Sequence, residues 1–257
     1  MDILCPVCLQ KLTKYEKTYA CENRHSFDIA REGYLNLSLK NSQKSGDNPD
    51  MIRARKAFLE KGYYDFLRDE VNDLLNEDDS LVDLACGEGY YTAFFKCKDK
   101  TGIDLSKSGL KIASRADKST VYLLSSIFRT PLADRCADQV ITIFAPIAKE
   151  EICRILKDDG SFILVRPDER HLLELKEILY EKPYLNDASR IEIEGLKFLK
   201  EISVSRKEKV PQEDLMNLFM MTPYCNTTSQ NDKDKLKQIT ETDISFCFLI
   251  DIYRKAA

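Results

Sequence analysis

Three cysteines and a histidine in the first 25 residues have the spacing of a metal site. They follow the pattern C-x2-C-x12-C-x3-H and are Cys5, Cys8, Cys21 and His25. Thiolates and imidazole suit Zn²⁺, and two such pairs can surround the ion tetrahedrally. Because protein fills all four positions and leaves none for water, the pattern predicts a structural zinc site. A segment this short needs such a metal to stay folded.

A glycine turn near residue 88 is the second candidate for chemistry. The apolar residues Leu81, Val82 and Leu84 before it predict a buried parallel strand. Gly87 and Gly89 allow a sharp turn and the close approach of a ligand to the backbone. The helix expected next would offer unpaired N–H groups and the positive end of its dipole. These features suit a nucleotide-like ligand that carries a carboxylate.

The pattern D-x-x-C-G-x-G of this turn resembles motif I of class I S-adenosylmethionine (SAM) methyltransferases. It lacks the third glycine of the dinucleotide fingerprint, because Thr92 occupies that position. Ala85 stands where the methyltransferases commonly have glycine. Asp104 ends the next expected strand, and an acid at this point can accept hydrogen bonds from both ribose hydroxyls.

The elements around this turn alternate between strand and helix. We expect strands near 80–85, 100–104, 119–124, 138–144, 161–165, 199–208 and 244–253. We expect helices near 50–61, 65–75, 90–97, 106–116, 148–157, 168–180 and 211–220. Alternation at this spacing predicts an α/β fold whose sheet is mostly parallel. Seven strands that end in an antiparallel hairpin match the Rossmann-like class I SAM-methyltransferase fold.

The chain divides by composition into three parts. Residues 1–39 form the expected zinc module, which residues 26–39 close as strand and turn. Residues 40–49 are polar and non-periodic, which predicts a linker. Lys40 and Lys44 in the linker would be solvated or would touch a phosphate backbone. Residues 50–257 form the expected methyltransferase domain.

The composition indicates the localisation of the protein and the kinds of partner that it can bind. Of the 257 residues, 43% are hydrophobic and 32% are charged. The sequence shows no apolar run long enough for a membrane span and no signal peptide. We therefore expect a cytoplasmic protein. The net charge of −4 argues against a uniformly basic nucleic-acid binder, but residues 1–60 carry ten Lys/Arg against eight Asp/Glu. We interpret the remaining cysteines as small apolar side chains and not as disulfides: Cys86, Cys97, Cys136, Cys153, Cys225 and Cys247.

Further segments of the chain, together with the zinc spacing and the glycine turn, match the sequence pattern of one family. They include 25–37, 54–59 with Gly62 and Tyr64, 86–92, 103–107, 144–146, 170–176 and 221–223. Nearly end to end, the chain resembles the bacterial 23S rRNA (guanine-N1)-methyltransferases of the RlmA family. The resemblance implies transfer of the SAM methyl group to guanine N1 in a domain II hairpin of 23S rRNA. It also implies a homodimer.

The resemblance assigns site residues by motif match. The SAM contacts would be Tyr64, Gly87, Glu88, Gly89, Asp104, Ser125, Ser126 and His171. Phe144 is a candidate for stacking on the guanine or, equally, a core aromatic. His171 is a candidate general base, a cofactor contact or a packed residue at a helix start. The sequence does not name the group that accepts the N1 proton.

Two other functions fit parts of this pattern. The methyltransferase could act on tRNA or another macromolecule. Alternatively, the chain could be a zinc-dependent RNA-binding protein with a vestigial SAM site, although Gly87, Gly89 and Asp104 argue against that. The zinc module mixes aromatic and basic residues, as RNA-contacting surfaces do: Tyr15, Tyr19, Arg24 and Arg31. We therefore expect this module to hold the RNA.

Overall fold

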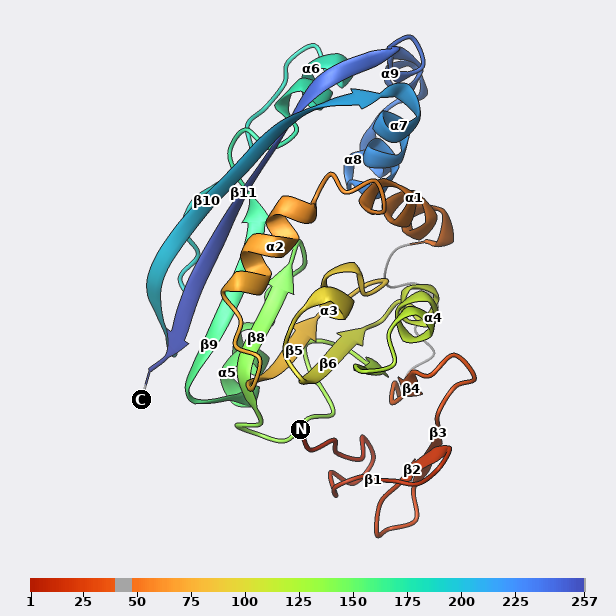
Figure 1. Cartoon of the computed structure of the whole chain (residues 1–257), viewed down its shortest axis with the longest axis vertical. Helices are drawn as coiled ribbons and strands as arrows, with labels where there is room; N and C mark the ends of the chain where they lie inside the picture. Colours follow the sequence, from red (N-terminus) through yellow and green to blue (C-terminus); the bar gives the residue numbers. More distant parts are fainter. Residues whose placement is uncertain (40–47, 257) are drawn as a thin grey trace.

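A computed structural model describes residues 1–39 and 48–256 of the chain. An eight-stranded sheet runs through the molecule in the order β10-β11-β9-β8-β5-β6-β7-β4 (Figure 1). In this order the strands are Leu196–Pro211, Glu241–Lys255, Leu156–Pro167, Ala137–Ile143, Ser80–Leu84, Asp99–Asp104, Val121–Leu124 and Leu35–Asn36. The six strands from β9 to β4 are parallel, and β11 pairs antiparallel with both β9 and β10. The predicted α/β fold with a closing antiparallel hairpin is confirmed.

Helices cover both faces of this sheet. In chain order α1 to α9 are Pro49–Leu59, Asp65–Asp73, Tyr90–Phe94, Lys107–Ala116, Lys149–Ile155, Leu173–Leu179, Gln212–Met221, Tyr224–Thr227 and Gln230–Leu236. Successive strand residues point to opposite faces, so Leu81 and Ile141 enter one buried core while Val82 and Val140 enter the other. This explains why central strands such as β5 and β8 carry apolar residues on both faces. None of the described helices is long and apolar enough to cross a membrane.

The N-terminal residues form a small antiparallel sheet at the lower end of Figure 1, with β1 (Thr13–Lys14), β2 (Thr18–Ala20) and β3 (Ser26–Asp28). The segment expected to close this module, 26–39, does so only through Ser26–Asp28 in β3, because Leu35–Asn36 joins the large sheet as β4. Leu35 pairs with Leu123 and Asn36 with Leu124. An edge strand therefore joins the seven expected strands and ties the zinc module to the main domain.

The expected linker lies mostly at 40–47, outside the described residues, together with Lys40 and Lys44. Its last residues begin the first helix. The Asn48 side chain accepts hydrogen bonds from the N–H groups of Asp50 and Met51, both at 2.9 Å. Pro49 follows at the first helical position, where its missing N–H costs nothing.

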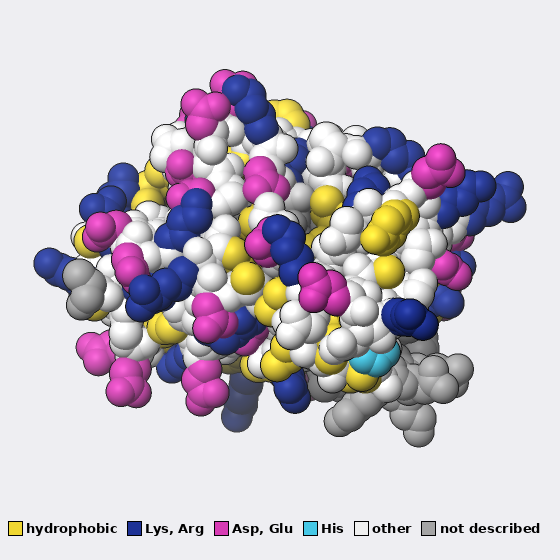
Figure 2. All heavy atoms as spheres, turned by 90° about the horizontal axis from the view of Figure 1, so that it is seen from below, with side chains coloured by type: hydrophobic (Ala, Val, Ile, Leu, Met, Phe, Trp, Pro, Cys, Tyr) yellow, Lys and Arg dark blue, Asp and Glu magenta, His cyan; other side chains and the backbone are white. Residues whose placement is uncertain are grey.

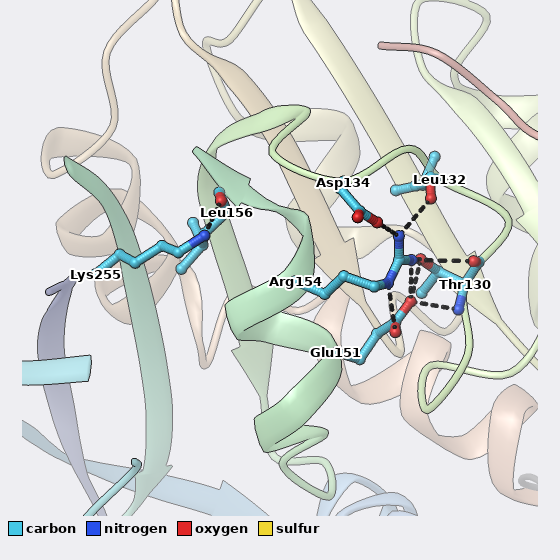
Figure 3. A network of polar contacts seen from close by, with 7 residues as sticks. All are labelled: Thr130, Leu132, Asp134, Glu151, Arg154, Leu156 and Lys255. Atoms are coloured by element: carbon cyan, nitrogen blue, oxygen red, sulfur yellow. Dashed lines mark hydrogen bonds and ion pairs between the residues drawn. The ribbon is translucent and has the colours of Figure 1, made fainter. Parts of the chain in front are cut away.

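A buried polar network holds the loop between β7 and β8 (Figure 3). Arg154 on α5 donates to the Glu151 carboxylate at 2.6 Å and to the carbonyl oxygen of Leu132 at 2.8 Å. Glu151 in turn accepts from the N–H and the hydroxyl of Thr130, each at 2.6 Å. The loop that starts with Ser125 and Ser126 is thereby fixed to α5.

Candidate functional site

The four predicted zinc ligands converge. Their ligand atoms all lie within 4.8 Å of one another. The Sγ atoms of Cys5 and Cys21 are each 3.5 Å from Nδ1 of His25, and Sγ of Cys8 is 3.6 Å from Sγ of Cys21. Tetrahedral zinc with bonds of about 2.3 Å to sulfur and 2.0 Å to nitrogen separates neighbouring ligand atoms by roughly 3.5–3.8 Å. The donor set and its spacing therefore fit Zn²⁺ bound through Nδ1 of His25.

The glycine turn requires glycine for both backbone and space. Gly87 and Gly89 have φ values of +57° and +81°, in the left-handed region that favours glycine. A Cβ atom on Gly89 would lie 2.8 Å from Cβ of Ala113 on α4 and 2.9 Å from the Tyr122 hydroxyl on β7. The turn therefore packs closely against α4 and β7, and its backbone lies at the carboxyl edge of the sheet.

Ala85 adopts φ +67°, also in the left-handed region. An L side chain there costs roughly 1–2 kcal/mol. This explains in physical terms why related motifs carry glycine at this position. The departure noted in the sequence leaves the turn intact but strained.

Asp104 reaches the turn from the end of β6. Its Oδ2 accepts from the N–H of Gly87 at 2.8 Å, and its Oδ1 accepts from the N–H of Ser106 at 2.6 Å. A carboxylate can accept about four hydrogen bonds, so these two are compatible with acceptance of ribose hydroxyls. The N–H of Ser125 donates to the backbone carbonyl of Asp104 at 3.1 Å and brings the end of β7 alongside. Ser126 follows, half-buried.

Asp83, the first residue of the D-x-x-C-G-x-G pattern, lies behind the turn. It is buried, and Oγ1 of Thr92 donates to its carboxylate. Burial raises the pKa of Asp83 to about 7, against the lowering effect of the Thr92 hydrogen bond. Thr92, at the position of the absent third glycine, therefore braces the strand before the turn.

The helix after the turn is shorter than expected. α3 has five residues, Tyr90–Phe94, where 90–97 was predicted. Lys100 on β6 ends it by donating to the carbonyl oxygens of Thr92 at 3.0 Å and Phe95 at 2.9 Å. A five-residue helix has only a small dipole, so the expected attraction of an anion to its start is weak.

Aromatic rings from distant segments meet beside the turn. The Tyr64 ring centroid is 6.2 Å from Phe144, 6.4 Å from His171 and 5.0 Å from Phe248. Tyr64 and Phe248 are buried, whereas 42% of Phe144 is exposed. Phe144 also has φ +56°, and such strain clusters at functional sites. Phe248 belongs to an apolar strand in the sequence, which gave no sign that it would line this cluster.

His171 is buried, and its Nδ1 accepts from the N–H of Cys247 at 3.2 Å. This hydrogen bond places the ring proton on Nε2. Burial lowers the pKa of His171 to about 3. His171 is therefore a neutral hydrogen-bond donor, which disfavours the candidate role of general base.

Electrostatic contacts connect the aromatic cluster to the turn. Arg55 on α1 lies 3.8 Å from the Glu88 carboxylate. Burial raises the pKa of the Tyr64 hydroxyl, and the positive charge of Arg55 acts in the opposite direction. The ion pair therefore places α1 beside the glycine turn. Arg55 was visible in the sequence on its expected helix, but nothing there placed it over the turn.

Matches to two family models agree with this geometry. Residues 3–45 match the family model described as RlmA, N-terminal, and residues 82–164 match a methyltransferase domain. A solved structure from Bacillus halodurans, provisionally named a methyltransferase, aligns with a TM-score of 0.48 at 14% identity, covering 71% of this chain and 95% of that chain. Fold, glycine turn and zinc ligands define a class I SAM-dependent methyltransferase with an N-terminal zinc ribbon.

Two curated relatives indicate the family to which this methyltransferase belongs. YxjB of Bacillus subtilis (strain 168), provisionally named a 23S rRNA (guanine-N1)-methyltransferase, is 30% identical over 264 residues, 94% of this chain and 93% of that protein. The 23S rRNA (guanine(748)-N(1))-methyltransferase of Streptomyces fradiae is 33% identical over 186 residues, 68% of this chain and 66% of that protein, just under two thirds. The chain belongs to the RlmA-type family of 23S rRNA (guanine-N1)-methyltransferases.

Proposed function

We propose that this chain transfers the SAM methyl group to N1 of a guanine in a domain II hairpin of 23S rRNA. The observation that carries the proposal is the nearly end-to-end similarity to a relative named for guanine-N1 methylation of 23S rRNA. The name of the Streptomyces fradiae relative makes guanine 748 the first position to test. Residues 1–39 would recognise the RNA, and residues 50–257 would catalyse the transfer.

Positioning would supply much of the rate. Guanine N1 carries a proton and is a poor nucleophile until that proton leaves, and bound SAM supplies a methyl group activated by a sulfonium. Asp104 would hold the ribose, and Ser125 and Ser126 would lie against the adenine. Tyr64 and His171 would close over the cofactor from the opposite side of the turn.

The partly exposed Phe144 side chain is suited to stack on the guanine that receives the methyl group. Recognition of a guanine at N1 requires the base to be unstacked or taken from a loop. Phe144 ends β8 at the carboxyl edge of the sheet, where open α/β sheets bind ligands. Its partial exposure and its contacts with Tyr64 and Phe248 support a stacking role. The acceptor of the N1 proton has no candidate among these residues, since His171 is a neutral donor.

The zinc module offers a limited RNA surface. Tyr15 is 60% exposed, and Arg24 and Arg31 are also exposed. Tyr19, predicted to share this surface, is instead only 8% exposed, because it packs into the core that the module shares with the main domain. Figure 2 shows Lys and Arg interleaved with Asp and Glu on the face seen from below. Contact through a few side chains fits this surface better than a broad basic field.

The acceptor can be tested directly. Purified protein would be incubated with labelled SAM and either 23S rRNA from cells lacking the modification or total tRNA. Label on 23S rRNA supports the proposal. Label on tRNA alone would favour the alternative acceptor, and absence of SAM binding would favour a vestigial site. Action in the cytoplasm as a homodimer completes the proposal, and light scattering at micromolar concentration tests the dimer.

A further inference from the structure

Arg55 lies directly over the glycine turn, although 32 residues separate it from Gly87 in the chain. Its Nη1 is 3.8 Å from Oε2 of Glu88 and 3.8 Å from the point that a Cβ atom on Gly87 would occupy. α1 thus delivers one positive charge to the part of the turn that a ligand must approach.

The ion pair between Arg55 and Glu88 is long. A charge-assisted hydrogen bond between such groups measures about 2.7–2.9 Å, roughly 1 Å shorter than the observed separation. The Glu88 side chain is 6% exposed and that of Arg55 is 25% exposed. Two opposite charges therefore lie side by side at a largely buried place without a hydrogen bond between these two atoms.

A buried hydroxyl marks the same place. The Tyr91 hydroxyl is inaccessible to solvent, and within the described part of the chain it has no hydrogen-bond partner. Burial raises the pKa of the Tyr91 hydroxyl, and the charges of Glu88, which raises it further, and of Arg55, which lowers it, also act on it. A buried hydroxyl without a partner costs roughly 1–3 kcal/mol, so it indicates a polar group that arrives with a ligand.

The amino-acid end of SAM has the complementary chemistry, since it carries an α-carboxylate and an α-ammonium group. The short α3 has little dipole to offer the carboxylate. We propose that Arg55 recognises the α-carboxylate of SAM, with the Tyr91 hydroxyl as a second donor, while Glu88 accepts from the α-ammonium group. This inference rests on SAM as the cofactor and is independent of which RNA accepts the methyl group.

Binding of two cofactors tests the assignment without RNA. Isothermal titration calorimetry would measure the affinities of the full-length zinc-loaded protein for SAM and for decarboxylated SAM, which lacks only the α-carboxylate. Arg55→Gln should weaken SAM binding roughly 10- to 100-fold, because it removes a hydrogen bond to a charged group. Its affinity for decarboxylated SAM should be unchanged or slightly higher. Tyr91→Phe should show the same selectivity with a smaller loss.

Two variants serve as controls. Arg53→Gln changes an arginine on the same helix whose side chain is 72% exposed and pairs with Asp50, so it should leave both affinities unchanged. Glu88→Gln should weaken both cofactors alike, because both keep the ammonium group. Circular dichroism and zinc content would confirm folding, and Arg55→Lys retains the charge if the glutamine variant is unstable.

An equal loss for both cofactors in Arg55→Gln would overturn the assignment, because it would show that Arg55 only supports the turn. Unchanged SAM affinity would overturn it as well. Selective loss of SAM binding together with no methyl transfer to rRNA would leave the carboxylate site standing and contradict the proposed acceptor instead.

Discussion

His171 shows how the fold changes the chemistry that a residue type suggests. As an isolated side chain it would titrate near neutrality and suit general base catalysis. Burial lowers its pKa to about 3, and the N–H of Cys247 donates a hydrogen bond to its Nδ1. We predict that its ring stays neutral, with the proton on Nε2, across the physiological range.

Nuclear magnetic resonance of the ring nitrogens can check this prediction, since the chain has two histidines. The His171 resonances should not shift between pH 8 and pH 5 in the folded protein, whereas in urea they should titrate near pH 6.5. A midpoint near pH 6.5 in the folded protein would restore His171 as a candidate base.

Asp83 makes the free energy of unfolding depend on pH. Its pKa is raised to about 7 by burial, so the folded state holds a proton that the unfolded state releases near pH 4. The stability from this group is full below about pH 4 and is lost as pH rises through 7. Asp83→Asn removes this titration and keeps an acceptor for Thr92.

The free energy of unfolding, measured in urea from pH 4 to pH 8, tests the effect. Relative to the wild type, Asp83→Asn should gain about 4 kcal/mol over this range, from roughly three pKa units at 1.36 kcal/mol each. Asp78→Asn is the control, because its side chain is 90% exposed. A pH-independent difference for Asp83→Asn would show that its carboxyl is ionised throughout.

Among the elements, the zinc module depends most on one interaction. Its strands β1 to β3 have two or three residues each and cannot form a core alone. Cys8→Ala should lose the zinc and unfold the module, which metal analysis and hydrogen exchange of residues 1–30 would detect. Exposed Val7→Ala is a matched control. Zinc content equal to the wild type would contradict the assigned ligand set.

Strands such as β5 and β8 were predictable from the sequence because both of their faces are buried, so apolar residues occupy both faces. β4 was not, since two residues pair with β7 across 88 positions of sequence and carry no periodic signal. α8 and α9 were missed for a related reason: segment 224–236 is mostly polar. Local patterns identify elements, but they do not show which distant elements pair.

The same limit applies to the site. Cys5, Cys8, Cys21 and His25 could be predicted because zinc ligands follow a fixed spacing, and the glycine turn because its residues are contiguous. Arg55 and Phe248 lie in segments that are separate from the turn in the sequence. Only the folded chain brings them to the turn.

At the scale of the whole molecule, we propose that the zinc module and the catalytic domain act on one RNA. Because β4 belongs to the large sheet, deleting the module would damage both, so surface substitutions are the better test. Tyr15→Ala with Arg24→Ala should weaken binding of the rRNA hairpin about tenfold, since one stacked base contributes roughly 1–3 kcal/mol. SAM affinity should not change.

Gel-shift titration with a domain II hairpin measures this effect at fixed salt. A matched control is Lys98→Ala, which changes an exposed charge in the loop before β6, outside the zinc module. Undiminished RNA binding by the double variant would assign the module another task.

The measurement that tests the central claim most directly is the mapping of the methylated nucleoside. Purified protein, SAM and 23S rRNA lacking the modification would be combined, and the RNA analysed by mass spectrometry after site-specific digestion. The account predicts 1-methylguanosine at a single guanine of a domain II hairpin. A different methylated nucleoside, or no product although SAM and zinc are bound and ribosomal precursor particles are supplied, would contradict it.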